Sequence, residues 1–244
     1  MQIEGSVAIV TGANRGLGRA FARALVERGA AKVYGAARDA GTVTDEGVVP
    51  VGLDVTDAEQ VRRAVQSCGD VTLLVNNAAV MTNTPLIGAP DMEAARHEME
   101  VNYFGVLSMC RAFAPLLAAN GGGAIVNMHS VVSFFTPPAS GSYGVSKAAV
   151  WAMTNGVRVE LARQGTLVVG VHCGFVDTDM TAGVDAPKLA PDEVVRQAFD
   201  GVEAGQVEVL VDELTRSMKA SLPRDQELVY PGILAAWEAD QAGV

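Results

Sequence analysis

The sequence is poor in the groups that bind nucleic acids or metals. Its 244 residues include 18 Lys and Arg against 28 Asp and Glu, which gives a net charge of −10 at pH 7. A chain this acidic is repelled by phosphate backbones and anionic membranes, so we expect neither a nucleic acid nor a membrane as partner. The three histidines, His97, His129 and His172, lack metal-ligand spacing. We therefore expect no catalytic metal.

Cysteine is equally scarce. Cys68, Cys110 and Cys173 form no CxxC motif and are odd in number, which is typical of free thiols in a reducing compartment. The first residues, MQIEGSVAIV, lack the basic start and the longer apolar run of a signal peptide. No stretch approaches the roughly 20 apolar residues that a membrane span needs. These features predict a soluble, cytoplasmic protein.

The sequence does contain short apolar runs, rich in β-branched residues, that alternate with longer helical patterns. Strands are predicted at residues 6–10, 32–36, 48–54, 72–76, 123–128, 166–173 and 207–211. Strands this apolar are covered on both faces, which predicts a doubly wound α/β fold with a parallel sheet. A single domain over residues 1–244 suits this length. Thr56 and Glu59 predict a capping box at the start of one helix.

A glycine-rich turn, TGANRGLG at residues 11–18, follows the first predicted strand and opens a helix. Gly12, Gly16 and Gly18 would let the backbone turn tightly and approach a pyrophosphate, while the helix N-terminus supplies free N–H groups. The turn therefore predicts a dinucleotide site, which also includes Asn14, Arg15 and Leu17.

The end of the second predicted strand, YGAARD, bears on the choice of dinucleotide. An NAD site usually has an acidic residue here, but Ala36 and Ala37 occupy the expected position and Arg38 follows. Arg15 and Arg38 together would clamp a 2′-phosphate, which favours NADP. The alternative is that Asp39 binds the ribose and the cofactor is NAD.

The end of the third predicted strand adds Asp54 and Val55 to the cofactor candidates. Asp54 either accepts a hydrogen bond from the adenine amine or simply caps the strand end.

Tyr143 and Lys147 lie one helical turn apart in SGSYGVSKAAVWAM and so share a face. A nearby ammonium is expected to lower the tyrosine pKa from about 10, which would make Tyr143 a general acid or base. Ser130 follows the fifth predicted strand, at the same sheet edge, and would polarise a carbonyl. Ser133 is a weaker rival for that role.

Taken together, these motifs resemble those of the short-chain dehydrogenase/reductase family, of the classical type with about 250 residues. TGANRGLG matches the family's TGxxxGxG, NNAA at 76–79 matches NNAG, and CGFVDT at 173–178 matches PGxVxT. YGVSK, beginning at Tyr143, matches YxxSK and follows Ser130 at the family spacing. The resemblance covers residues 4 to 211 and implies a Rossmann fold.

The resemblance also implies residue roles. Tyr143 would donate a proton to a carbonyl oxygen while NADPH delivers hydride, Lys147 would assist it, and Ser130 would orient the substrate. Asn102, in EVNYFG, matches the family's catalytic asparagine and would hold a water in a proton relay. The cofactor would be bound by Asn76, Ala78, Tyr143, Lys147, Val176 and Thr178, in addition to the candidates above.

Three departures from the family pattern stand out. Ala79 replaces the last glycine of NNAG. Cys173 replaces the proline of PGxVxT, and it is either a small apolar filler or a thiol that makes activity sensitive to thiol reagents. After the last strand the chain continues as VDELTRSMKASL, where many relatives end. We interpret DELTRSMK as a solvated face.

The predicted substrate is a neutral, hydrophobic ketone or aldehyde, or the corresponding alcohol. The predicted pocket is apolar, lies beside a loop over residues 178–191, and consists of Val131, Val132, Phe134, Phe135, Ala139, Phe175 and Met180, with Met81 nearby. Apolar helices at 104–119 and after Tyr143 predict a homodimer or homotetramer. The alternatives are an imine reductase or dehydratase on the same scaffold, or a non-catalytic NADP(H)-sensing protein.

Overall fold

The computed structural model describes residues 1–242, so the last two residues of the predicted domain lie outside the described part. Its centre is a parallel sheet of seven strands in the order β3-β2-β1-β4-β5-β6-β7. The strands are β1 (Val7–Thr11), β2 (Lys32–Ala37), β3 (Val48–Gly52), β4 (Leu73–Asn76), β5 (Ala124–Met128), β6 (Leu167–His172) and β7 (Glu208–Leu210). All seven predicted strands are confirmed, and their ends differ from the predicted ends by two residues at most.

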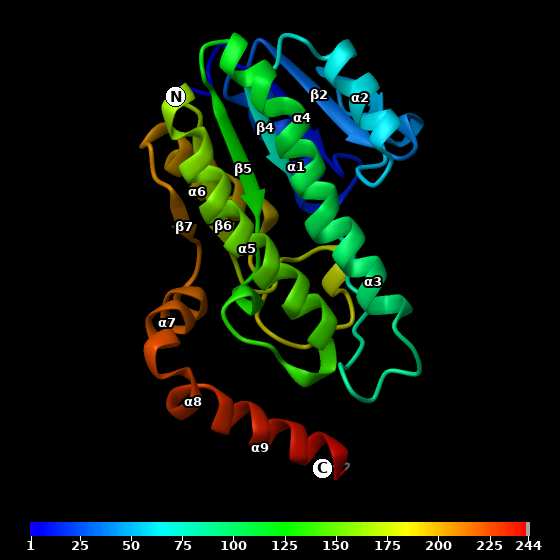
Figure 1. The fold of residues 1–244 in the computed structure, drawn as a ribbon, viewed down its shortest axis with the longest axis vertical. Helices are drawn as coiled ribbons and strands as arrows, with labels where there is room; N and C mark the ends of the chain where they lie inside the picture. Colours follow the sequence, from blue (N-terminus) through cyan, green and yellow to red (C-terminus); the bar gives the residue numbers. More distant parts are fainter. Residues whose placement is uncertain (243–244) are drawn as a thin grey trace.

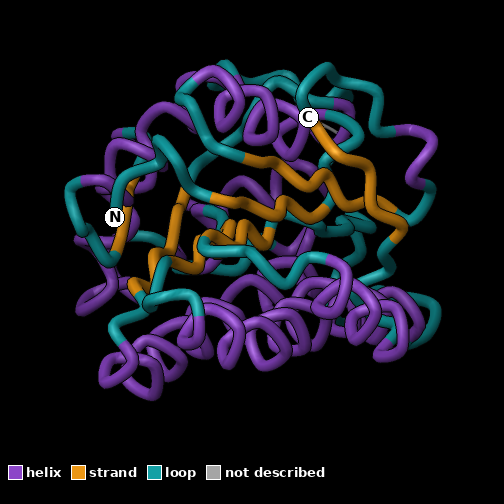
Figure 2. The backbone as a smooth tube through the Cα atoms, turned by 90° about the horizontal axis from the view of Figure 1, so that it is seen from above, coloured by secondary structure: helices purple, strands orange, loops and turns teal. Residues whose placement is uncertain are grey.

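Helices cover both faces of the sheet, as Figure 2 shows. The principal helices are α1 (Gly16–Glu27), α2 (Ala58–Ser67), α3 (Glu93–Met99), α4 (Val106–Ala119), α5 (Gly141–Leu161), α6 (Pro191–Glu203), α7 (Glu213–Ser221), α8 (Asp225–Leu228) and α9 (Tyr230–Gln241). A π-helical stretch, Glu100–Gly105, joins α3 to α4. In Figure 1, α7, α8 and α9 follow one another away from the end of β7.

The core has two halves, one on each side of the sheet. On one side α1 packs against α6, where Phe21 and Phe199 meet edge to face with 5.4 Å between ring centroids. On the other side α2, α4 and α5 cover the sheet with Phe113, Leu117 and neighbouring apolar residues. Strands buried on both faces carry apolar side chains at nearly every position, which is why the apolar runs identified them.

One helical run departs from the expectation about membranes. Glu93–Ala119 is long and apolar enough to cross a membrane by length and composition alone. Its residues Met109, Phe113 and Leu117 are fully buried against the sheet, as in the core helix of a globular domain. Core helices of globular proteins share this length and apolar composition.

The sheet order reverses between β1 and β4, and this places the site. In doubly wound sheets, ligands bind outside the carboxyl ends of the strands at such a switch point. The glycine-rich turn leaves β1 at this edge. The tight packing there needs glycine, because a Cβ on Gly18 would overlap the Gly12 carbonyl oxygen. Gly12 has φ +67°, a conformation that side-chain-bearing residues rarely adopt.

Candidate active site

A cleft of about 800 Å3 lies along the carboxyl edge of the sheet. Most of the predicted cofactor residues line it, namely Gly12, Asn14, Arg15, Gly16, Leu17, Gly18, Arg38, Asp54, Val55, Ala78, Tyr143, Lys147, Val176 and Thr178. Ser130 lines the same cleft. The glycine turn and the Ser130, Tyr143 and Lys147 side chains therefore share one continuous space.

The glycine turn is built to receive an anion. Gly16 has φ +50°, and α1 begins there with Arg15 as its N-cap. The Arg15 side chain makes no capping hydrogen bond, so the N–H groups of the first turn have no side-chain partner. Free N–H groups at the positive end of a helix dipole fit a phosphate.

The end of β2 holds the residues that bear on cofactor choice. The strand ends at Ala37, which is buried, and the exposed Arg38 follows in the cleft. Asp39 also lines the cleft, but its Oδ1 accepts a hydrogen bond from the Gly41 N–H at 2.9 Å and caps a short turn. Arg15 forms an exposed ion pair with Asp179 at 3.5 Å. Such a pair is weak and leaves the guanidinium free to exchange partners.

Asp54 lines the cleft with its carboxylate already in use. Its Oδ1 accepts hydrogen bonds from the Thr56 N–H at 2.9 Å and the Thr56 hydroxyl at 2.7 Å. The predicted capping box is wrong, since the N-cap of α2 is Asp57, whose Oδ1 accepts from the N–H groups of Glu59 and Gln60. The Thr56 hydroxyl cannot cap the helix because it donates its hydrogen bond to Asp54. The Asp57 carboxylate accepts the two free N–H groups in its place.

Ser130, Tyr143 and Lys147 meet at the end of the cleft near β5. Ser130 is the N-cap of a 3-10 turn, η3 (Val131–Ser133), while Tyr143 and Lys147 lie in the first turns of α5. The Lys147 Nζ donates a hydrogen bond to the Met128 carbonyl at 3.0 Å and lies 5.7 Å from the Tyr143 ring centroid. Both side chains are buried, with 9% of Tyr143 and 4% of Lys147 exposed.

Burial dominates the electrostatics of this group. It raises the pKa of Tyr143 well above its ordinary value, and the Ser130 hydroxyl acts in the opposite direction. Burial also lowers the pKa of Lys147 to about 8. The expected lowering of the Tyr143 pKa by Lys147 is therefore not found in this state, because burial of the phenol raises the pKa most and the neighbouring Cys173 raises it further. Tyr143 is fully protonated at neutral pH, as a proton donor must be.

The structure also places the rival serine. The Ser133 side chain is buried and its Oγ accepts a hydrogen bond from the Ser130 N–H at 3.3 Å. Ser133 does not line the cleft, whereas Ser130 does. The geometry favours Ser130 as the hydroxyl available to a substrate.

Two predicted asparagines lie behind the cleft and do not line it. The Asn102 amide, fully buried, bonds to both main-chain groups of Val80 and donates to the Ser146 Oγ at 2.9 Å. The Asn76 Nδ2 donates to the Asn127 Oδ1 at 2.8 Å. Asn77 lines the cleft instead, with its Nδ2 donating to the Thr11 carbonyl at 2.9 Å. The adjacent asparagines in NNAA were the only signal that could have identified it.

The apolar end of the cleft differs from the predicted pocket. Val132, Phe175 and Met180 line it, but Phe134 and Ala139 do not. Phe134 is buried behind the cleft, stacked on His172 with 4.5 Å between ring centroids. The predicted Val131, Phe135 and Met81 line the cleft as well, and Pro137 and Leu214 add lining that was not predicted. Leu214 was missed because it lies in α7, far along the chain from every motif.

Two histidines are buried beside this site. His129 and His172 stack with 4.5 Å between ring centroids, and 4% of His129 and none of His172 is exposed. Burial lowers the pKa of His129 well below its ordinary value and that of His172 to about 4. Both are neutral at pH 7.

This burial predicts loss of stability in mild acid. The pKa of His172 is lower in the folded chain than in the unfolded one. The unfolded chain therefore binds a proton at His172 more readily, so the free energy of unfolding is highest above about pH 6.5 and decreases as the pH falls toward 4. From His172 alone, the free energy of unfolding should drop by roughly 2 kcal/mol between pH 7.5 and 5. Urea unfolding at the two pH values measures it. His172→Phe should reduce the drop, and an equal drop in the variant would contradict the assignment.

Cys173 lies in the cleft but is only 5% exposed, and burial raises its pKa to about 12. Since the thiolate is the reactive form, we expect iodoacetamide at pH 7.5 to leave any catalytic activity of the cleft nearly unchanged. Cys68 and Cys110 are buried free thiols as well. Rapid inactivation that Cys173→Ser abolishes would show instead that this thiol is reactive.

Within residues 1–242, no three His, Cys, Asp or Glu side chains gather as metal ligands do.

Comparisons with known proteins find relatives of this chain. A family model described as short chain dehydrogenase matches residues 6–189. The 3-oxoacyl-(acyl-carrier-protein) reductase of Vibrio harveyi is 32% identical over 199 residues, covering 78% of this chain and 81% of that protein.

Two solved structures are similar in fold. A short chain dehydrogenase from Burkholderia cenocepacia, in complex with NADP, is 44% identical with a TM-score of 0.92, covering 96% of this chain and 99% of that one. A short chain dehydrogenase/reductase from Burkholderia phymatum, in complex with NAD, is 25% identical with a TM-score of 0.83, covering 93% and 96%. Relatives of this chain thus include both an NADP complex and an NAD complex.

Proposed function

This chain belongs to the short-chain dehydrogenase/reductase family, and we propose that it interconverts neutral ketones or aldehydes and alcohols with NADP(H). The observation that carries the proposal is the meeting of Ser130, Tyr143 and Lys147 in the same cleft as the glycine turn. A proton donor and an anion site in one continuous space are what hydride transfer to a carbonyl requires.

The proposed roles follow from these contacts. When bound, the reduced nicotinamide supplies a hydride to the carbonyl carbon. Ser130 holds the carbonyl oxygen by a hydrogen bond, and Tyr143 donates its phenolic proton to that oxygen, which yields the alcohol. The positive charge of Lys147 stabilises the tyrosinate that remains. A proton from solvent then restores Tyr143, so each turnover consumes one hydride and one proton.

Asn102 is proposed to support the return of that proton. Its side chain already makes hydrogen bonds to Val80 and Ser146, so its main-chain groups would be the ones that contact a relay water. The carboxamide of the cofactor would be held by Val176 and Thr178. Asn76 is proposed to keep β4 and β5 in register through its hydrogen bond to Asn127, without contacting the cofactor itself.

The preference for NADP rests on charge at the end of β2. Arg38 lines the cleft directly after β2, and Arg15 lines it from the glycine turn. The strand-end position is Ala37, which offers no carboxylate to the ribose. The NADP complex of the Burkholderia cenocepacia relative supports the same choice.

The three cysteines are unpaired, which agrees with the cytoplasmic location that we propose.

Absorbance at the reduced-nicotinamide band tests this function. We expect NADPH to be consumed only when a ketone or aldehyde is present, and faster than NADH at equal concentration. NADPH binding without turnover over a broad carbonyl panel would contradict the enzymatic proposal and favour a cofactor sensor. Turnover of imines alone would favour the imine reductase.

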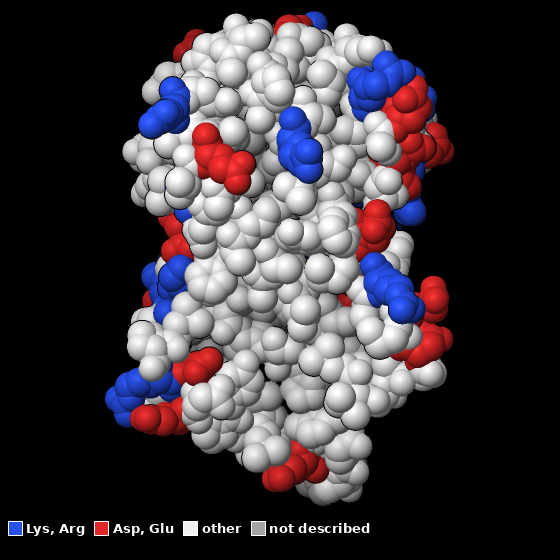
Figure 3. All heavy atoms as spheres, in the orientation of Figure 1, with Lys and Arg blue, Asp and Glu red and all other residues white. Residues whose placement is uncertain are grey.

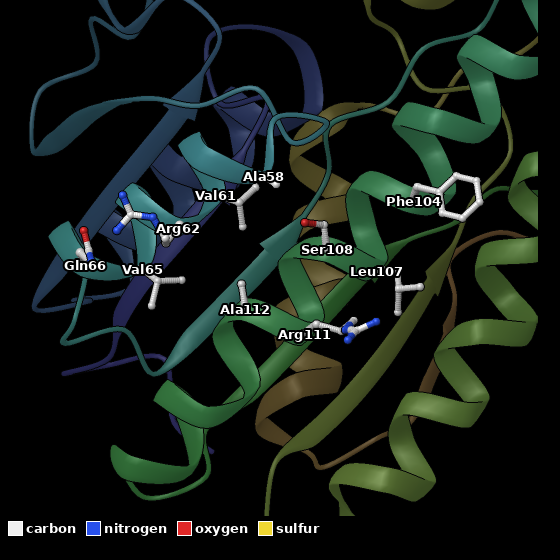
Figure 4. Close-up of a pocket in the computed structure, with 10 residues that line it drawn as sticks. All are labelled: Ala58, Val61, Arg62, Val65, Gln66, Phe104, Leu107, Ser108, Arg111 and Ala112. Atoms are coloured by element: carbon white, nitrogen blue, oxygen red, sulfur yellow. The ribbon is translucent and has the colours of Figure 1, made fainter.

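We also propose a homo-oligomer formed through the outer faces of α4 and α5. Figure 3 shows that the centre of this face carries few charged residues. Phe104, in the π-helical stretch that leads into α4, is 50% exposed, and Val159 of α5 is 77% exposed. A hollow of about 690 Å3 between α2 and α4 adds apolar surface, with Arg62 and Arg111 among its lining residues (Figure 4).

Sedimentation at micromolar concentration should therefore show a dimer or tetramer. Phe104→Asp would place a charge on the proposed contact surface and should shift the species toward monomer. A wild-type monomer at that concentration would contradict the proposal.

A further inference from the structure

Helix α7 contributes to the cleft, which the sequence did not indicate. The sequence DELTRSMK predicts a solvated face, but Leu214, in the first turn of α7, lines the cleft. Its side chain is 47% exposed. Among the cleft's large apolar residues, Phe175 and Met180 are similarly exposed, at 42% and 43%. Apolar surface left open inside a cleft is what a hydrophobic ligand would cover.

The start of α7 is attached to the loop after β6. Asp212 is the N-cap of α7, and its Oδ1 accepts a hydrogen bond from the Thr215 N–H at 2.8 Å. The other carboxylate oxygen accepts from the Gly174 N–H at 2.7 Å. Gly174 lies between Cys173 and Phe175 in the cleft wall. One carboxylate thus fixes α7 to the segment that carries Phe175.

The end of α7 is attached to the catalytic elements. The Lys219 Nζ lies 5.0 Å from the Phe134 ring centroid and 4.6 Å from that of Trp151. It also forms an ion pair with Glu208 at 2.8 Å. Phe134 directly follows the η3 turn that Ser130 caps, and Trp151 lies one helical turn after Lys147 in α5. Cation–π contacts of a partly desolvated lysine are strong enough to hold such elements together.

We propose that α7 is a fixed wall of the substrate site, in which Leu214 contacts the substrate and limits its size. Asp212 and Lys219 act as positioning residues that hold this wall against the β6 loop and the catalytic helix. The inference rests on the proposed function and narrows it to hydrophobic carbonyl compounds whose bulky end lies between Leu214, Phe175 and Met180.

Changes at Leu214 test the contact. Acetophenone and 2-acetylnaphthalene carry the same methyl ketone and differ by one fused ring. Leu214→Trp should lower kcat/KM for the larger ketone by about 10-fold or more and change the smaller one little, since a few methylene groups in an apolar pocket are worth that factor. Leu214→Ala should shift the ratio between the two ketones in the opposite direction.

A matched control and a binding readout keep the result decisive. Leu228→Ala makes the same change at an exposed leucine of α8 that does not line the cleft, and it should leave the ratio unchanged. Calorimetric binding of both ketones to the NADP-loaded protein gives the same comparison without turnover. If the ratio of kcat/KM between the two ketones is unchanged in both Leu214 variants, or if neither ketone binds, the proposal that α7 is a wall of the substrate site is wrong. Size-dependent binding without turnover would support the wall and contradict the enzymatic function.

The positioning role of Lys219 has its own test. Lys219→Met should raise the KM for 2-acetylnaphthalene about fivefold with little change in NADPH affinity, because the wall loses its attachment to Phe134 and Trp151. Lys219→Arg keeps the cation and should restore the wild-type KM. A lower melting temperature with unchanged kinetics in the methionine variant would show that Lys219 only stabilises the fold, and the proposed positioning role would be wrong.

Discussion

Replacing Tyr143 with phenylalanine should lower kcat/KM for carbonyl reduction by roughly 10³-fold, within the range that general acids contribute. That factor corresponds to about 4 kcal/mol of transition-state stabilisation. The variant lacks only the phenolic oxygen, so the buried ring keeps its packing. NADPH affinity should fall by a small factor at most, because the variant loses one of many proposed cofactor contacts while the glycine turn and the end of β2 are untouched. Steady-state kinetics and a fluorescence titration with NADPH measure the two quantities.

Tyr34→Phe is the matched control. Tyr34 lies in β2, and its hydroxyl donates to Asp70 at 2.8 Å outside the cleft. The same chemical change there should leave kcat/KM within a small factor of the wild-type value. If Tyr143→Phe retained most of its activity, another group would have to supply the proton and the proposed mechanism would be wrong.

Ala37→Asp should reverse the choice of cofactor, lowering the ratio of kcat/KM for NADPH over NADH by roughly 100-fold. A carboxylate at the end of β2 accepts hydrogen bonds from ribose hydroxyls and repels a 2′-phosphate. Arg38→Ala should weaken NADPH use without a matching effect on NADH, because it removes the charge that the 2′-phosphate would meet. Parallel assays with the two cofactors measure both ratios.

Asp39→Asn tests the competing assignment. Because the Asp39 carboxylate caps the turn that contains Gly41, its neutralisation should leave the cofactor ratio nearly unchanged. If wild-type protein prefers NADH and Asp39→Asn abolishes that preference, Asp39 binds the ribose and the NADP assignment fails.

The parts of this fold that sequence predicted are those governed by local rules. Buried parallel strands need apolar side chains on both faces, and β5 and β6 satisfy this almost throughout. The glycine turn was visible because a backbone turn at Gly12 and Gly16 constrains residue type. The N-cap of α2 does not follow from local sequence, since Thr56 and Asp57 are adjacent and only the side-chain geometry decides between them.

What sequence could not predict depends on packing between distant segments. Leu214 reaches the cleft because β7 ends at the same sheet edge as β5, and no motif marks it. The loop position of Phe134 predicts a pocket residue, but its ring is buried against Trp151 and Lys219. The pKa of Tyr143 follows from its burial, which a YxxxK spacing does not reveal.

The most direct test of hydride transfer is a labelling experiment. The protein would be incubated with a ketone substrate and NADPH carrying deuterium at both C4 positions, and the alcohol analysed by mass spectrometry. The account predicts one deuterium on the carbinol carbon of each alcohol molecule, and no labelled alcohol above background with Tyr143→Phe. Alcohol without deuterium, or cofactor binding with no alcohol formed from any ketone or aldehyde, would contradict it.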